Sequence, residues 1–239
     1  MISLSVNINK VATLRNSRGI DVPNLRDTIE ICLNAGCHGI TVHPRSDQRH
    51  IRFDDLPVVK SAIDGRAELN VECDPAEEFI ELVLTTRPTQ CTLVPTVPGE
   101  ITSSVVFDLT RHADELRPKI ERLKQDGIRV SLFSGTDPEQ VQLAKRLDVD
   151  AIELYTGPYA MASVGHARDA EYAKLLKAAE AADRLGLRVH CGHDLTVDNL
   201  APIARLPGLK EVSIGHHLIA RALMLGLPTV IREHLGILS

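Results

Sequence analysis

The chain has 239 residues, of which 44% are hydrophobic and 25% charged, a composition typical of a folded protein rather than a disordered one. Its 27 basic and 32 acidic residues give a net charge of −5, which argues against a nucleic-acid or anionic-membrane partner. Aromatic residues make up 3% of the chain, so we expect an aliphatic core and no base-stacking surface.

Short β-branched or aliphatic runs recur along the whole chain and predict strands. These runs are continuous rather than strictly alternating, which is typical of a parallel sheet that helices cover on its faces. The eight predicted strands are Ser3–Asn9, Gly39–His43, Ala67–Glu72, Gln90–Val94, Ile128–Phe133, Ala151–Tyr155, Leu187–Gly192 and Glu211–Gly215.

Helical patterns fill the intervals between these runs. Pro23 is expected to begin the first helix and Gly36 to end it, while the pair Asp137-Pro138 begins a later helix and Gly186 ends a long one. Strand followed by helix, repeated eight times without a linker, predicts a single-domain (β/α)₈ TIM barrel over residues 1–239.

An open doubly wound sheet is the alternative fold. Such a sheet usually carries a Gly-rich phosphate turn after a strand, but the chain contains neither G-x-G-x-x-G nor G-x-x-x-x-G-K-[ST]. The barrel is therefore the favoured interpretation.

The cysteines and the beginning of the chain suggest a reducing compartment. The five Cys form no C-x-x-C pair, which argues against a disulfide framework. Met1 is followed at once by a strand-like run, so no secretory leader is expected. No apolar run approaches the length of about 20 residues that a transmembrane helix needs. We expect a cytoplasmic protein. The histidine spacings match no common metal motif, so no metal and no cofactor are expected.

Polar and ionisable residues follow several strands where a barrel would place its functional rim. Each of them taken singly has an alternative interpretation as a loop anchor or a surface residue. The candidates are Asn7, Asn9, Lys10, Arg15 and Arg18 after the first strand, His43, Arg45, Arg49 and His50 after the second, Glu72, Glu153, His190, His193, Asp194, Gly215, His216 and His217.

Glu72 is the best candidate for a general base. A carboxylate at a crowded barrel mouth loses hydration, which favours a raised pKa suited to proton abstraction, although a structural ion pair would use the same residue. Lysine Schiff-base chemistry is less favoured because only Lys10 follows a strand end.

The arginines indicate anionic substrates. Arg18, Arg45 and Arg49 offer guanidinium groups to phosphate oxygens, and the Gly215 turn opens the last helix region, where backbone N–H groups welcome an anion. Two anion sites predict one bisphosphate or two phosphorylated substrates. The long loop from 95 to 106, which includes Pro98 and Thr102, either closes over substrate or is a simple surface connection.

Several segments resemble the pyridoxine 5′-phosphate synthase family, and they occur in family order along essentially the whole chain. The matching segments are Val6–Gly19, Gly39–Arg45, Arg49–Ile51, Asn70–Glu72, Leu93–Pro95, Gly127–Phe133, Gly192–Thr196 and Ile214–His216.

The resemblance implies a ring-closing synthase of the transferase type. Such an enzyme condenses 1-deoxy-D-xylulose 5-phosphate with 3-amino-2-oxopropyl phosphate, forming pyridoxine 5′-phosphate, inorganic phosphate and water, with no cofactor. Two phosphorylated substrates agree with two anion sites. The resemblance also implies assembly into a homo-octamer.

The resemblance further implies roles for individual residues. His43 and Glu72 match proton acceptors, His193 matches a proton donor, and Glu153 matches a carboxylate that stabilises the transition state. The positions that match binding of the amino-ketone phosphate are Asn7, Arg18, Asp194, Gly215 and His216, and those that match binding of the deoxyxylulose phosphate are Arg45, His50 and Thr102.

The chain departs from the common family pattern at three positions. Many members have Asp-His where this chain has Asn9-Lys10, and Gly where it has Asp194. We keep Asn9 and Lys10 as expected substrate contacts. Two other functions stay open: a non-catalytic phosphate-metabolite binding barrel, and another phosphate-handling isomerase or aldolase.

Overall fold

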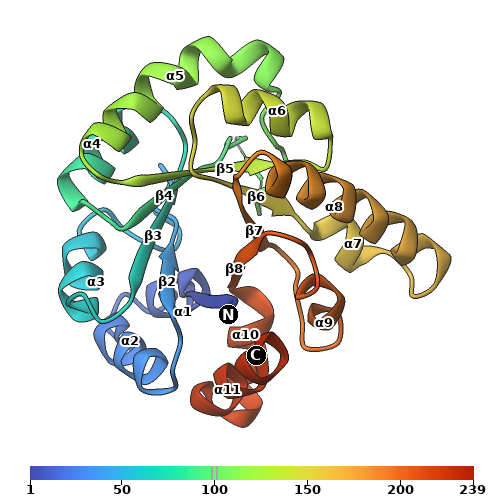
Figure 1. Cartoon of the computed structure of the whole chain (residues 1–239). Helices are drawn as coiled ribbons and strands as arrows, with labels where there is room; N and C mark the ends of the chain where they lie inside the picture. Colours follow the sequence, from blue (N-terminus) through green and yellow to red (C-terminus); the bar gives the residue numbers. More distant parts are fainter. Residues whose placement is uncertain (98, 101) are drawn as a thin grey trace.

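The computed structural model describes residues 1–97, 99–100 and 102–239. Eight parallel strands pair in chain order, and β8 pairs with β1 to close a barrel. Helices surround the barrel on its outside (Figure 1). The predicted (β/α)₈ barrel is therefore confirmed, and the open-sheet alternative is wrong because the sheet has no free edge.

The strands lie close to their predicted positions, with ends that differ by a few residues. They are β1 Ser3–Asn7, β2 Gly39–Val42, β3 Glu68–Cys73, β4 Gln90–Leu93, β5 Arg129–Ser134, β6 Ala151–Tyr155, β7 Arg188–Gly192 and β8 Leu209–Ile214.

The helices form an outer ring with short additions next to the loops. They are α1 Asn9–Asn16, α2 Leu25–Asn34, α3 Asp55–Ile63, α4 Glu77–Thr86, α5 Leu109–Gln125, α6 Pro138–Arg146, α7 Gly157–Met161, α8 His166–Arg184, α9 Leu200–Ile203, α10 His216–Leu225 and α11 Leu227–Leu238.

The first predicted strand is too long at its carboxyl end. Asn9 begins α1 instead of ending β1. The side chain of Asn7 accepts a hydrogen bond from the Asn9 N–H at 3.0 Å, which turns the chain out of the sheet immediately after the strand. Asn9 and Lys10 therefore approach the barrel mouth from a helix.

Local helix signals act as the sequence predicts, with small shifts. The Asn24 side chain, rather than Pro23, caps α2 by accepting from the Asp27 N–H at 3.1 Å. The Asp137 side chain caps α6 in the same way. Gly36 and Gly186 have φ of +96° and +70°, conformations that glycine adopts without steric strain just after a helix ends.

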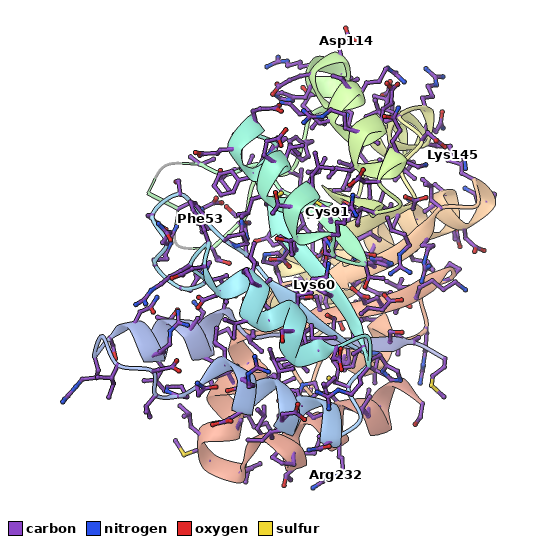
Figure 2. The ribbon with its side chains drawn as sticks, turned by 90° about the vertical axis from the view of Figure 1, so that its left-hand side faces the viewer. Phe53, Lys60, Cys91, Asp114, Lys145 and Arg232 are labelled. Atoms are coloured by element: carbon purple, nitrogen blue, oxygen red, sulfur yellow. The ribbon has the colours of Figure 1, made fainter. Side chains whose placement is uncertain are left out.

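Two different layers fill the molecule. Aliphatic side chains pack between the strands and the helices, and Cys91 on β4 belongs to this layer. Figure 2 shows Asp114, Lys145 and Arg232, all exposed, at the outer edge of the molecule. The buried layer inside the barrel is polar by contrast: Ser5 and Thr41 hydrogen bond at 2.6 Å, and Thr92 donates to Asn70 at 3.1 Å.

Candidate active site

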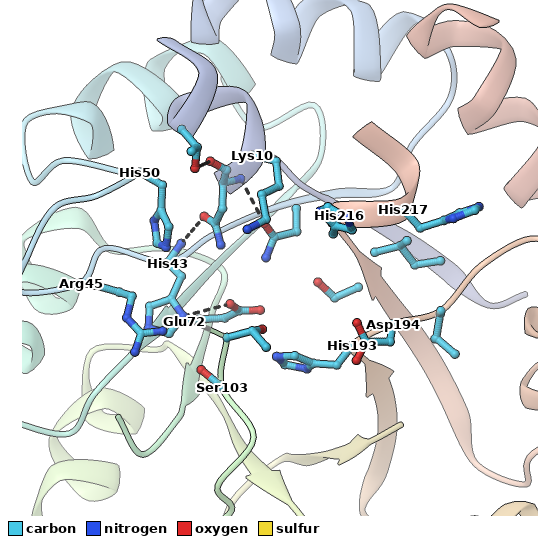
Figure 3. Close-up of a pocket in the computed structure, with 18 of the residues that line it drawn as sticks. Lys10, His43, Arg45, His50, Glu72, Ser103, His193, Asp194, His216 and His217 are labelled. Atoms are coloured by element: carbon cyan, nitrogen blue, oxygen red, sulfur yellow. Dashed lines mark hydrogen bonds and ion pairs between the residues drawn. The ribbon is translucent and has the colours of Figure 1, made fainter. Parts of the chain in front are cut away.

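A cavity opens at the carboxyl ends of the strands, where a barrel gathers its loops (Figure 3). Most of the predicted site residues line it: Asn7, Asn9, Lys10, His43, Arg45, Arg49, His50, Glu72, Thr102, Glu153, His193, Asp194, Gly215, His216 and His217. The loop-by-loop placement inferred from the sequence thus brings residues from seven strand ends to one cavity.

His43 and Glu72 form the first acid–base pair of the cavity. The His43 Nδ1 atom lies 3.3 Å from Glu72 Oε2, and the two side chains are 6% and 7% exposed. The Asn9 side chain accepts a hydrogen bond from the His43 backbone N–H at 2.9 Å, which ties the beginning of α1 to the end of β2. The pair can therefore hold and move a proton in a water-poor setting.

Glu153 and His193 form a second pair, in which the pKa values of the two groups are shifted in opposite directions. Burial raises the pKa of Glu153 well above its ordinary value, and Glu72 and Glu211 raise it further. Burial lowers the pKa of His193, although Glu72 and Asp194 oppose this shift. These opposite shifts favour a protonated Glu153 carboxyl beside a neutral His193 imidazole, 3.9 Å apart, over an ion pair.

Gly192 on β7 leaves space for the Glu153 side chain of the neighbouring strand β6. A Cβ atom on Gly192 would overlap the Glu153 Oε1 atom. Glycine at this position is therefore required by the carboxyl group on the neighbouring strand. The His193 ring packs against the rings of Phe133 and Tyr155, with centroids 4.8 Å and 5.5 Å away.

Cationic and neutral donors gather on the opposite wall of the cavity. Arg45 is buried, with its Nη2 atom 3.8 Å from Glu100 Oε2. Burial lowers the pKa of His50 to about 3, and its Nδ1 atom accepts from the Ile51 N–H at 3.0 Å. The neutral His50 ring therefore carries its proton on Nε2, where it can donate to a phosphate oxygen.

A helix terminus provides a further site for an anion. Gly215 precedes α10, and the free N–H groups of the first helical turn attract negative charge. A Cβ atom on Gly215 would lie 3.2 Å from Asn7, so the end of β8 passes close to the end of β1. Lys10 extends into the same space from α1 (Figure 3).

The loop after β4 contributes Thr102 and Ser103 to the cavity wall, as expected for a segment that faces substrate. Arg49 donates a hydrogen bond to the Glu100 backbone carbonyl at 2.8 Å, which connects this loop to the one after β2. Pro98, which the sequence places in this loop, lies outside the described residues.

Two arginines of the first loop are placed differently from the cavity-lining candidates. Arg18 is exposed beyond the end of α1 and does not line the cavity, so its binding role stays a prediction. Arg15 is buried and forms two hydrogen bonds with Asp55, at 2.6 Å and 2.8 Å. The structure therefore gives Arg15 the alternative role of a loop anchor.

Some cavity residues escaped the sequence analysis. Ser213 lines the cavity two positions after the buried Glu211 of β8. The two-residue period of a strand, counted from Glu211, would have found it. Thr13 also lines the cavity, and its position one helical turn after Asn9 and Lys10 is the signal for it.

A metal site requires grouped ligand side chains, and a membrane span requires a long apolar helix. Within residues 1–97, 99–100 and 102–239, no three His, Cys, Asp or Glu side chains are grouped so that they could hold a metal ion. None of the helices that the structure describes combines the length and the apolar character needed to cross a bilayer.

Comparison with known proteins assigns the chain to a family. The family model described as "Pyridoxal phosphate biosynthesis protein PdxJ" matches residues 4–239. The chain belongs to this family. The pyridoxine 5′-phosphate synthase of Leptospira biflexa is 44% identical over 255 residues, which cover 100% of this chain and 98% of that protein. The pyridoxine 5′-phosphate synthase of Brucella anthropi is 47% identical over 241 residues, covering 99% and 98%.

These matches confirm the PdxJ family resemblance drawn from the sequence motifs. Similar solved structures support the same architecture at much lower identity. Phosphoribosyl anthranilate isomerase from Thermotoga maritima has a TM-score of 0.63 at 13% identity, covering 100% of this chain and 98% of its own. The YdjI aldolase from Escherichia coli K12 has a TM-score of 0.62 at 12% identity, covering 99% and 88%. Likeness at this identity shows the barrel fold alone.

Proposed function

We propose that the chain is a pyridoxine 5′-phosphate synthase. The proposed reaction condenses 1-deoxy-D-xylulose 5-phosphate with 3-amino-2-oxopropyl phosphate and releases inorganic phosphate and water. The observation that carries the proposal is the meeting of two acid–base pairs, His43 with Glu72 and Glu153 with His193, in one cavity of a PdxJ-family chain.

The reaction needs groups that accept protons from the substrates and groups that donate protons to them. Amine attack on a ketone and the later ring closure release protons, whereas loss of water requires a proton on the departing oxygen. His43 and Glu72, 3.3 Å apart, are suited to accept protons in turn. His193 is suited to deliver one, and the raised pKa of Glu153 favours a proton on the neighbouring carboxyl.

Two groups of residues are suited to hold the two phosphates. Arg45, His50 and Thr102 would bind the deoxyxylulose phosphate, with Asn9 and Lys10 as neighbouring contacts. Two separate phosphate-binding groups would hold both substrates side by side for condensation, which reduces the entropic barrier to their reaction. The amino-ketone phosphate would be bound by Asn7, Asp194, Gly215 and His216, and we retain Arg18 for this group although it is exposed in the single chain.

The assignment is tested with purified protein and both substrates. We expect release of inorganic phosphate together with the absorbance of a new pyridine ring, with one phosphate released for each ring formed. Saturable binding of a substrate without turnover would favour the non-catalytic binding barrel instead. A product without a pyridine ring would favour an isomerase or aldolase.

The remaining parts of the proposal concern organisation. We propose that residues 1–239 form one domain and that the chain assembles into a homo-octamer, as the family resemblance implies. Sedimentation velocity of the purified protein measures the assembly, and a single species of about eight chain masses is expected. A monomer with full synthase activity would contradict the octamer and leave the reaction assignment intact.

A further inference from the structure

The backbone that carries His193 has an unusual conformation. His193 and Asp194 have φ of +77° and +58°, in the left-handed region that residues with a Cβ atom rarely adopt. Two such residues in succession persist only where the surrounding structure holds them. The contacts of this segment therefore decide where the His193 ring lies.

Three consecutive carbonyl groups of this segment are each held by a hydrogen bond. The Gly192 carbonyl accepts from the Thr156 backbone N–H at 3.0 Å, and the His193 carbonyl accepts from the Thr156 hydroxyl at 2.6 Å. The Asp194 carbonyl accepts from the Asn199 side-chain amide at 3.2 Å. Because each carbonyl lies in one peptide plane, these bonds set the torsions on both sides of His193.

The Thr156 hydroxyl is the donor that the His193 carbonyl depends on. The hydroxyl also lies within hydrogen-bond distance of the Gly192 carbonyl, but it has only one proton to give. The Gly192 carbonyl already has the Thr156 N–H as a donor. Thr156 is 0% exposed, so solvent has no ready access to replace the hydroxyl.

The same segment supports both members of the Glu153–His193 pair. Thr156 follows the end of β6, three residues after Glu153, and its hydroxyl reaches across to the residue after the end of β7. The 193–194 peptide plane adjoins the Cα atom of His193, whose ring packs against Phe133 and Tyr155 with Nδ1 3.9 Å from Glu153.

We propose that Thr156 is a positioning residue, whose hydroxyl holds the His193 imidazole beside Glu153 by fixing the 193–194 peptide plane. The inference rests on the proposed function for the role of His193 in proton transfer. It assigns to Thr156 no contact with substrate.

The first test compares two substitutions at the same position. Thr156→Val keeps the shape of the side chain but removes the donor, and we expect kcat to fall about 10-fold to 100-fold with KM for either substrate nearly unchanged. Thr156→Ser keeps the hydroxyl and should retain kcat within about threefold. Thr28→Val on α2 removes a hydroxyl that donates to the Asn24 backbone carbonyl, outside the cavity, and serves as the matched control with unchanged kcat.

The second test follows His193 directly by an NMR pH titration and requires no turnover. In Thr156→Val we expect the pKa of His193 to rise toward its ordinary value, because the ring leaves its buried site. Thr156→Ser should preserve the lowered pKa. A purely structural role for Thr156 would reduce the folded fraction and leave the titration of the folded protein unchanged.

The two tests separate this inference from the reaction assignment. Wild-type protein without synthase activity would refute the assignment, while the His193 titration would still decide the role of Thr156. An unchanged His193 titration in Thr156→Val, or equal damage by the Ser and Val substitutions, would overturn the inference. If Thr156→Val does not fold, Thr156→Ala removes the same donor with a smaller side chain, and full kcat with an unshifted His193 pKa in that variant would overturn the inference equally.

Discussion

Glu72 and Glu153 both face the barrel mouth, but their partners differ. Glu72 contacts the His43 imidazole at 3.3 Å, whereas Glu153 is 2% exposed and has other carboxylates as its main electrostatic neighbours. The raised pKa of Glu153 favours its protonated form. The two carboxyl groups are therefore suited to different steps of one reaction.

Replacing Glu72 by Gln tests its proposed role as a proton acceptor. The amide keeps the size of the side chain but cannot accept a proton, so we expect kcat to fall about 100-fold or more. KM for the two phosphorylated substrates should change little, because Glu72 is not among the residues proposed to hold phosphate. Steady-state phosphate release measures both quantities.

The exposed Glu121 on α5 provides the matched control, since Glu121→Gln makes the same chemical change outside the cavity. Unchanged kcat in Glu72→Gln would remove Glu72 from the mechanism. A proportional loss in both variants would point to an effect on the protein preparation rather than on proton transfer.

At the scale of elements, the chain order of strands and helices could be predicted because buried apolar runs and capping residues are local signals. The predicted end of β1 was wrong because the Asn7 side chain binds the Asn9 N–H and starts α1 at once. Candidate site residues were found because barrel strands end at one rim. The pairing of Arg15 with Asp55, 40 residues away, leaves no local pattern and needed the structure.

The Arg15–Asp55 pair is expected to stabilise the junction of α1 with α3. Its side chains are 6% and 11% exposed, and removing one partner leaves the other charge poorly solvated. We expect Arg15→Met to lower the free energy of unfolding by about 3–5 kcal/mol in urea denaturation. Arg66→Met, which breaks an exposed pair with Glu30, should have little effect. Equal effects of the two substitutions would contradict a special role for the buried pair.

At the scale of the whole molecule, an acidic chain brings several cationic side chains together at one cavity. The net charge of −5 excludes an overall basic surface, yet Lys10, Arg45 and Arg49 line one cavity together with the start of α10. Charge patterning of this kind suits two small phosphates better than a polyanion, because cationic groups are concentrated in a concave site. Global composition and local function are therefore compatible.

The polar barrel interior makes stability depend on pH through Glu211. Burial raises the pKa of Glu211 from an ordinary 4.5 to about 7, with Glu68 adding to the shift and Arg129 and Arg188 opposing it. Between these two values the folded chain holds a proton that the unfolded chain has released. The contribution of Glu211 to stability is therefore complete below pH 4.5 and declines as the pH rises to about 7.

Glu211→Gln removes this titration, because an amide stays neutral at every pH. We expect the difference in unfolding free energy between variant and wild type to shift in favour of the variant by about 2–3 kcal/mol from pH 5 to pH 8. Urea denaturation at the two pH values measures the shift, and Glu121→Gln on the exposed face of α5 should show none. Contributions from the histidines cancel in this difference as long as their surroundings are preserved. Parallel pH profiles for Glu211→Gln and wild type would mean that Arg129 and Arg188 keep Glu211 ionised inside the barrel.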